Sequence, residues 1–292
     1  MKYTIQSEYL PLKEVYIKPV VNAFINEPKI AAEWASLNYL GKPDFNTAKR
    51  EYEAFLQVLT AGGALAVPMP LDSSLSLDAL YCRDASIATD HGMILCRMGK
   101  AGRMTEPEAH KKVYEEANIP ILGTIESPGT LEGGDVAWLD AHTLAVGHSY
   151  RTNQAGIEQL KALLTPFGIQ VVVAALPHFR GPADVFHLMS VLSPVDKDLA
   201  VVYSPLMPIA FRNELLERGF QLIEVPEQEY DSLGCNVLAI GPRKCVLVKG
   251  NPITESALIK AGCEVFSYEG NEISVKGGGG PTCLTRPLSR LA

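Results

Sequence analysis

The stretch DVAWLDAHTLAVGHSYRTNQAGIEQLKALLTPFGIQVVVAAL, residues 135–176, contains the pattern that decides the fold. Its first two apolar runs, 135–140 and 143–149, are joined by the short turn DAH, which predicts a β-hairpin. Helical periodicity follows over 153–165, and a third apolar, β-branched run occupies 169–176. The stretch therefore predicts the order strand, strand, helix, strand.

The same order recurs along the chain. Together with the start at Asp135, the starts at Ala85, Phe186 and Asn236 are spaced 50, 51 and 50 residues apart. A less regular first copy fits residues 12–70. The remaining helices are predicted over 46–61, 106–117, 208–218 and 252–261. Units of this size cannot bury their apolar faces alone, so they must stack or close into a ring.

Five such units predict an α/β fold, a five-bladed propeller of ββαβ repeats around a central channel. We expect one catalytic domain that spans residues 1–292. The alternative is an ordinary two-domain α/β chain with coincidental spacing, and the regular intervals argue against it. The first copy is interrupted by an insertion at 21–45, which contains Trp34, Leu37 and Tyr39 and is predicted to form a lid.

Composition excludes several classes of protein. The chain has 26 basic and 33 acidic residues, a net charge of −7, and no basic run, which argues against nucleic acid or an anionic membrane as the main partner. The N-terminal residues lack the apolar core of a secretory signal, and no apolar run is long enough to cross a bilayer. Six cysteines without a CxxC pair suggest neither a disulfide framework nor a zinc site. We expect a cytoplasmic protein without metal or cofactor.

In a ring of repeats, equivalent positions converge on the axis. The polar residues at or just before the first strand of each unit are Asp84, then Glu132 and Asp135, then His187, then Cys235 and Asn236. Cys283 follows the fifth unit, on the segment expected to pair with the first unit and close the ring. The spacing therefore predicts a composite site that combines carboxylates, an imidazole and a thiol.

These residue types suggest nucleophilic catalysis. A Cys283 thiolate would be served by His187 as general acid and base. Glu132 could orient the imidazole, as the third member of a triad does, and Asp84 could hold a cationic part of the substrate. The alternative is that the cysteine and the histidine are ordinary buried residues, because an isolated Cys–His pair is weak evidence.

Five motifs make the sequence recognisable: LYCRDASIATD (80–90), LEGGDVAWLD (131–140), RTNQAG (151–156), HLMS (187–190) and GGPTCLTRPL (279–288). Together they resemble the guanidine-modifying, pentein-fold superfamily, and most closely its dimethylarginine dimethylaminohydrolase branch. Arginine deiminases and amidinotransferases are the related branches. The resemblance implies the same five-bladed propeller. It also implies that Cys283 is the nucleophile, His187 the general acid and base, and Glu132 the residue that orients the imidazole.

The resemblance assigns substrate contacts as well. It implies that Asp84 and Asp78 contact the substrate, with Asp84 against the guanidinium. Arg103 and Arg151 fall where arginines of the family engage the substrate carboxylate, although Arg103 could also be solvated surface. Gly277 and Gly278 match positions that touch the α-amino end through the backbone. For Asp135, substrate contact and a role as a brace for the following strand both stay open.

The activity implied is hydrolysis of a C–N bond in a guanidino amino acid through a covalent thiouronium. The substrate would be an Nω-methylated arginine, giving citrulline and an alkylamine. Met189 stands where arginine deiminases carry an acidic residue, and Arg83 stands where dimethylarginine hydrolases often carry one, so the choice of substrate stays open. The alternatives are an arginine deiminase, an amidinotransferase that uses the same residues, and a non-catalytic binding propeller. A homodimer is also left open.

Overall fold

Five small sheets form the framework of the computed structural model, which describes residues 3–292. The second unit along the chain consists of β4 (Ser86–Thr89), β5 (Gly92–Leu95), α4 (Glu106–Glu116) and β6 (Ile121–Thr124). The third consists of β7 (Val136–Asp140), β8 (Thr143–His148), α5 (Gln154–Leu164) and β9 (Gln170–Ala175). The fourth consists of β10 (Leu192–Asp196), β11 (Leu199–Val202), α6 (Ile209–Glu217) and β12 (Gln221–Glu224). The fifth consists of β13 (Leu238–Gly241), β14 (Lys244–Val248), α7 (Pro252–Lys260) and β15 (Glu264–Tyr268).

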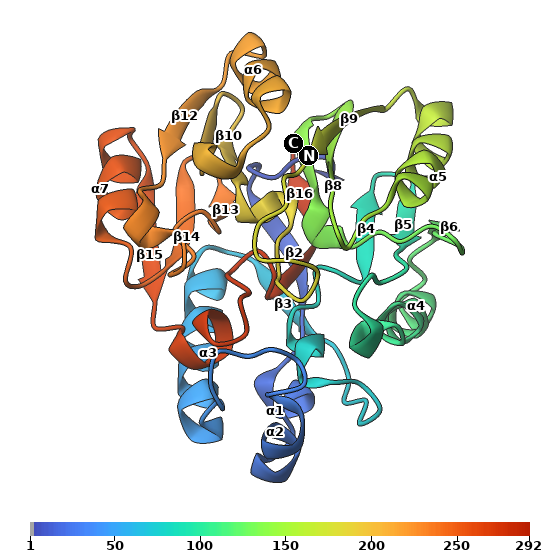
Figure 1. Ribbon diagram of the computed structural model, residues 1–292, viewed down its shortest axis with the longest axis vertical. Coiled ribbons are helices and arrows are strands. Elements are labelled where there is room, and N and C mark those ends of the chain that lie inside the picture. The colour runs from blue at the N-terminus through green and yellow to red at the C-terminus, as the bar shows by residue number, and fades with distance from the viewer. Residues whose placement is uncertain (1–2) are drawn as a thin grey trace.

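In each of these units the first two strands pair antiparallel and the third pairs parallel to the second. A parallel pair needs a crossover connection, and the helix between the second and third strands provides it. The strands lie toward the middle of the ring and the helices around its rim (Figure 1). This arrangement confirms the predicted ββαβ repeat.

The first unit is completed by the end of the chain. Strand β2 (Leu12–Ile17) is followed by α3 (Phe45–Ala61) and by β3 (Leu65–Pro68), which is parallel to β2. The last strand, β16 (Thr285–Leu291), pairs antiparallel with β2, and the short β1 (Tyr3–Thr4) pairs with β16. Strands β1 and β16, the first and last of the described residues, therefore lie side by side, and the predicted closure of the ring is confirmed.

The predicted start of the fourth unit at Phe186 is wrong by six residues. Leu188–Ser190 form a short 3₁₀ turn (η5), and β10 begins only at Leu192. Polar side chains hold the turn, because Asp135 accepts a hydrogen bond from the Leu188 amide and Ser190 accepts one from the His187 amide. A matching turn, η3 (Gly133–Asp135), precedes β7, so the two units begin in the same way.

The insertion at 21–45 lies against the first unit. It contains most of α1 (Val20–Ala23) and all of α2 (Glu27–Glu33), and the side chains of Leu37 and Tyr39 are buried in the core beside α3. Asn38 lies between them with a positive φ of 66°. Its side-chain amide nitrogen, Nδ2, donates a hydrogen bond to the Ala183 carbonyl at 3.3 Å. The insertion thus reaches a loop of the third and fourth units across the ring.

Burial follows the repeat. Helix α3 buries an apolar stripe that comprises Ala48, Tyr52, Phe55 and Leu59, whereas α4 buries the polar Glu106 and His110 beside Tyr114. Within residues 3–292, no helix is both long and apolar enough to cross a membrane. All six cysteines, each within this range, are free thiols.

Candidate active site

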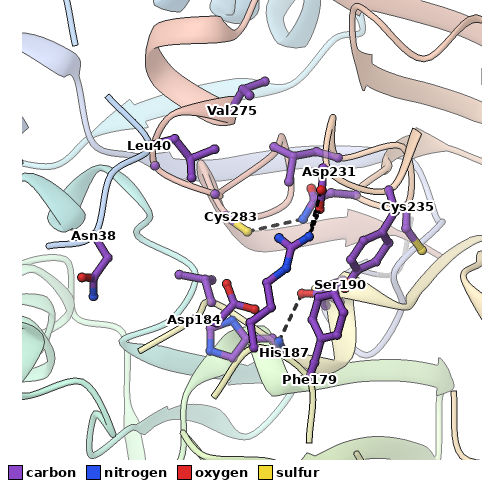
Figure 2. Close-up of a pocket in the computed structure, with 18 of the residues that line it drawn as sticks. Asn38, Leu40, Phe179, Asp184, His187, Ser190, Asp231, Cys235, Val275 and Cys283 are labelled. Atoms are coloured by element: carbon purple, nitrogen blue, oxygen red, sulfur yellow. Dashed lines mark hydrogen bonds and ion pairs between the residues drawn. The ribbon is translucent and has the colours of Figure 1, made fainter. Parts of the chain in front are cut away.

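Two adjoining cavities meet at the residues singled out by their spacing. The outer cavity has a volume of about 240 Å³, and the inner chamber beneath it about 20 Å³. Their walls share Val185, His187, Gly277, Gly278 and Cys283. Figure 2 shows Cys283 and His187 on the wall of the outer cavity, with Asn38 and Leu40 of the insertion at one side and Phe179 and Asp231 at the other.

His187 and Glu132 form a buried pair. The Nε2 atom of His187 lies 2.8 Å from Oε2 of Glu132, and the side chains are 4% and 0% exposed. Each residue directly precedes its 3₁₀ turn, so equivalent positions of two units supply the pair. The other carboxylate oxygen, Oε1, accepts hydrogen bonds from the backbone amides of Gly99 and Lys100 at 2.9 and 3.0 Å.

Both members of this pair are charged at neutral pH. Burial alone would lower the pKa of His187, but the charges of Asp135, Asp84 and Glu132 and the hydrogen bond that the imidazolium donates to Glu132 raise it to about 9. Burial likewise acts to raise the pKa of Glu132, and His187 with two nearby arginines outweighs it and lowers that pKa to about 2. The imidazole is therefore a protonated, oriented group that can act as a general acid.

Cys283 lies three residues after the last glycine of the run and two residues before β16. Its side chain is buried, and Nδ2 of Asn236 lies 3.4 Å from its sulfur. Burial, and next the negative charge of Asp84, raise the pKa of the thiol. A positively charged ligand beside Asp84 would act in the opposite direction and favour the thiolate.

Asp84 has one carboxylate oxygen committed and one available. Oδ2 forms an ion pair with Nη1 of Arg103 at 2.5 Å. Oδ1 is buried and has no hydrogen-bond partner within residues 3–292. A Cβ atom added to Gly134 would lie 2.7 Å from Oδ1 and 2.5 Å from Nδ1 of His187, so only glycine fits between the carboxylate and the imidazole. A buried acceptor without a partner is costly, and a donor from a ligand would relieve that cost.

Ligand atoms of Asp84, Glu132 and His187 lie within 4.8 Å of one another, which is close enough to hold a metal ion. Glu132 already holds the imidazole of His187, and Asp84 already pairs with Arg103. These pairs already neutralise the groups that a metal ion would need as ligands. The absence of a metal stays a prediction.

Arg103 is buried rather than solvated. Its guanidinium binds both oxygens of Glu106 at 2.7–2.8 Å, Asp84, and the carbonyl of Tyr81 at 2.9 Å. Four of its five N–H groups are thereby used. It lines the inner chamber, as does Arg151, which lies 3.6 Å from Glu132 and whose Nε has no partner within residues 3–292. Arg151 is thus more available to a ligand than Arg103.

The glycine run passes against an aromatic ring. A Cβ atom on Gly277 would overlap the Tyr81 hydroxyl, and one on Gly279 would overlap the Tyr81 ring. Gly278 has a φ of 76°, a conformation that favours glycine. Gly277 and Gly278 therefore bring bare backbone to the wall of both cavities, and Asp78 lines the inner chamber. Their contact with a substrate stays a prediction.

Comparison with known proteins agrees with this geometry. A family model described as N,N dimethylarginine dimethylhydrolase, eukaryotic, matches residues 37–290. The chain belongs to this family.

Relatives in sequence include dimethylarginine dimethylaminohydrolases and an arginine deiminase. The chain is 26% identical over 248 residues to the N(G),N(G)-dimethylarginine dimethylaminohydrolase of Pseudomonas aeruginosa, which covers 85% of this chain and 91% of that protein. It is 27% identical over 251 residues to the same enzyme of Streptomyces coelicolor, covering 86% and 89%. An arginine deiminase of Mycobacterium avium is 27% identical over 252 residues, covering 72% of this chain and 60% of the deiminase.

Solved structures share the fold. A mutant of the Pseudomonas aeruginosa enzyme complexed with citrulline superposes with a TM-score of 0.77 at 23% identity, covering 96% of this chain and 99% of that one. An amidinotransferase from Microseira wollei superposes with a TM-score of 0.80 at 17% identity, covering 98% and 96%. The chain is thus a pentein-fold member of the guanidine-modifying superfamily. It is similar in sequence to an arginine deiminase, and it shares its fold with an amidinotransferase.

Three residues that the resemblance left open have clear surroundings in this family member. Asp135 does not line either cavity; its oxygens accept hydrogen bonds from Ser149 at 2.6 Å and from the Leu188 amide at 2.9 Å. These contacts fit the bracing role, because they fix the turn that carries His187. Met189 lines the outer cavity, whereas Arg83 lines neither cavity and pairs with Glu8 at 2.8 Å.

Three features of the site were given no role from the sequence. Asn236 contacts the sulfur, and its place at the mouth of the fifth unit was the available signal. Arg180 and Asp231 form an ion pair at 2.8 Å on the outer cavity, which no pattern in the sequence indicated. Lys100 lines the inner chamber three residues before Arg103, and the charged stretch KAGR could have identified it.

Proposed function

We propose that this chain hydrolyses a C–N bond of an Nω-substituted guanidino compound, with Nω-methylated arginine as the candidate named by its family. The observation that carries the proposal is the arrangement around Asp84. A buried carboxylate oxygen, without a partner in residues 3–292, lies beside a protonated imidazole and a buried thiol, and all three residues line the inner chamber. A planar cationic guanidinium satisfies that oxygen with its N–H groups.

The first step is formation of the thiolate. When a guanidinium binds at Asp84, its positive charge lowers the pKa of Cys283, and the thiol proton leaves to solvent through the outer cavity. The thiolate then attacks the central guanidino carbon and gives a tetrahedral adduct. Asp84 holds the guanidinium in plane, so that this carbon stays electron-poor and within reach.

The second step uses the proton on His187. The imidazolium donates it to the departing amine as the C–N bond breaks, which leaves an S-alkylthiouronium on Cys283 and a neutral imidazole. The leaving amine would face the outer cavity, where the apolar side chain of Met189 can accept a methylated nitrogen. Glu132 keeps the imidazole oriented throughout.

The third step releases the product. Neutral His187 removes a proton from water, and the hydroxide adds to the thiouronium carbon. Collapse of this adduct breaks the C–S bond, its hydroxyl proton passes to the sulfur, and a ureido product such as citrulline departs. The cysteine and the imidazolium are thereby restored. Two proton transfers through one imidazole make His187 as important as the nucleophile, at about 10²–10⁴-fold per transfer.

A product assay tests the proposal. The purified protein is incubated with arginine, monomethylarginine and dimethylarginine, with and without glycine, and the products are identified by mass. Citrulline with dimethylamine supports the proposal. Citrulline with ammonia from arginine would indicate a deiminase, and ornithine that appears only with glycine would indicate amidino transfer.

The Cys283→Ser variant is the matched control. We expect it to fold as the parent does and to lose turnover by a factor on the order of 10⁶. If no guanidine is turned over and Cys283→Ser behaves as the parent in every assay, the chain is a non-catalytic propeller.

A further inference from the structure

Lys100 places a fixed ammonium in the inner chamber. Its Nζ lies 2.6 Å from Oδ2 of Asp78 and 2.8 Å from the carbonyl oxygen of Leu37. The Lys100 and Asp78 side chains are 13% and 4% exposed. An ion pair this well buried is screened little by solvent, so the charge of Asp78 is already neutralised before any ligand arrives.

The other carboxylates of the chamber are paired in the same way. Three line it, and each faces a cation of the chain: Asp78 faces Lys100, Asp84 faces Arg103, and Glu132 faces His187. Two buried polar atoms of its walls have no partner within residues 3–292, the acceptor Oδ1 of Asp84 and the donor Nε of Arg151. The chamber therefore offers an anionic position for one cation and a cationic position for one anion.

A second cation on the ligand has no carboxylate left to meet. An α-ammonium group would compete with Lys100 for Asp78, or lie near that lysine and Arg151 as a like charge in a dry site. A carboxylate would instead meet a chamber wall that carries both Lys100 and Arg151.

From this charge arrangement we infer that the substrate is an ω-guanidino carboxylate without an α-ammonium group. Its guanidinium binds Asp84, and its carboxylate binds Lys100 and Arg151. Any substituent on the far nitrogen extends into the outer cavity. The inference rests on the proposed guanidine hydrolysis and names its substrate class; Lys100 is the residue that sets the selection.

Matched substrates test the selection directly. Nω,Nω-dimethylarginine is compared with its analogue that lacks only the α-amino group, dimethylated 5-guanidinopentanoate, and with the shorter 4-guanidinobutyrate and 3-guanidinopropionate derivatives. We expect kcat/KM for at least one guanidino acid to exceed that for dimethylarginine by about tenfold or more. Equal values, or a preference for dimethylarginine, would overturn the inference and leave the proposed hydrolysis intact.

A substitution assigns the selection to Lys100. In Lys100→Met, KM for the guanidino acids should rise about 10- to 100-fold, because a charge-assisted contact is lost, while kcat changes little. KM for dimethylarginine should fall, since Asp78 is released to accept its ammonium. Lys111→Met, on the exposed face of α4, is the matched control and should change neither value. A uniform rise in KM for all substrates would refute the assignment.

Two further measurements keep the test decisive. Lys100→Met could fold poorly because Asp78 is left buried and unpaired. The double variant Lys100→Met/Asp78→Asn removes both charges, and we expect it to bind dimethylarginine and its analogue without the α-amino group equally. If the parent turns over no guanidine, the proposed hydrolysis fails. Calorimetric binding of 5-guanidinopentanoate and arginine to Cys283→Ser then still decides the inference, which requires the former to bind more tightly.

Discussion

Replacing Glu132 by glutamine removes one charge from the buried pair and keeps its shape. Oε2 of Glu132 lies 2.8 Å from the His187 ring, and neither group is accessible to solvent. The raised pKa of His187, about 9 against an ordinary 6.5, corresponds to a preference of about 3 kcal/mol for the charged imidazole. A carboxylate at this distance typically raises a pKa by about one to three pH units.

We therefore expect the pKa of His187 in Glu132→Gln to fall to near its ordinary value. Asp135 and Asp84 still favour the protonated imidazole, but burial opposes them and the contribution of the Glu132 carboxylate is lost. Fewer molecules then carry the imidazolium at pH 8, and the alkaline limb of kcat moves to lower pH.

The stability of the protein should respond with a definite sign. The contribution of His187 is fully present below pH 6.5 and is lost as the pH rises through about 9, because its pKa is raised in the folded state. That of Glu132 is present above pH 4.5 and is lost as the pH falls through about 2, because its pKa is lowered. The destabilisation caused by Glu132→Gln, about 3 kcal/mol for breaking a buried pair, is thus largest between pH 4.5 and 6.5 and shrinks above pH 9.

Two assays check these outcomes. Proton-detected NMR of the histidine rings follows the titration, with the His187 signal assigned by its loss in His187→Gln. Urea unfolding at pH 5.5 and 9.5 follows the stability. A His187 signal that titrates at the same pH in Glu132→Gln and in the parent would refute the reasoning, as would a loss of stability that does not depend on pH.

Three further substitutions separate catalysis, positioning and stability. Gly134→Ala introduces a Cβ atom 2.5 Å from Nδ1 of His187, so kcat should fall about 100-fold, whereas Gly41→Ala has only a 3.7 Å contact and should be silent in the same kinetic assay. Asp135→Asn should lower kcat about tenfold with an unchanged KM if the residue braces the turn before β10, and a raised KM would instead favour substrate contact. Glu229→Gln weakens three hydrogen bonds to Ile253 and Thr254 at the start of α7 and should cost about 1–3 kcal/mol in urea unfolding without changing kcat/KM.

Much of the fold could be predicted because the hydrophobic pattern of neighbouring residues identifies each helix and strand of the repeat. The five helices were expected over 46–61, 106–117, 153–165, 208–218 and 252–261, and they lie within one or two residues of those bounds. Apolar alternation and helical periodicity are properties of neighbouring residues, which a sequence shows directly. Ring closure followed from counting, since β16 was the strand without a partner in its own unit.

The start of β10 could not be predicted in this way. The run HLMSVLSPV is apolar enough for a strand throughout, yet its first part forms the turn Leu188–Ser190. The decision depends on Asp135, 53 residues earlier, whose oxygen binds the Leu188 amide. A contact at that separation leaves no trace in local periodicity, so tertiary structure overrides the pattern.

The candidate site shows the same division. Spacing brought Asp84, Glu132, His187 and Cys283 to one place, and their side chains do line one chamber. The ion pairs within that chamber could not be predicted from the sequence, because an arginine in a sequence does not reveal whether its N–H donors are free. Arg103 is committed to Glu106 and Asp84, and Lys100 to Asp78. These pairs are set by side-chain geometry across different elements, which residue type and spacing do not specify.

The charge of the ligand connects the two reactive groups. Asp84 raises the pKa of the Cys283 thiol and also contributes to the raised pKa of His187, so in the free protein one group keeps its proton as a thiol and the other as an imidazolium. A cation bound at Oδ1 of Asp84 offsets that single negative charge and lowers both pKa values together. The thiol then becomes a nucleophile and the imidazolium a better acid, which are the two changes that the first C–N cleavage needs. A neutral urea cannot produce either change, so the product of the proposed reaction would leave the site in its resting state.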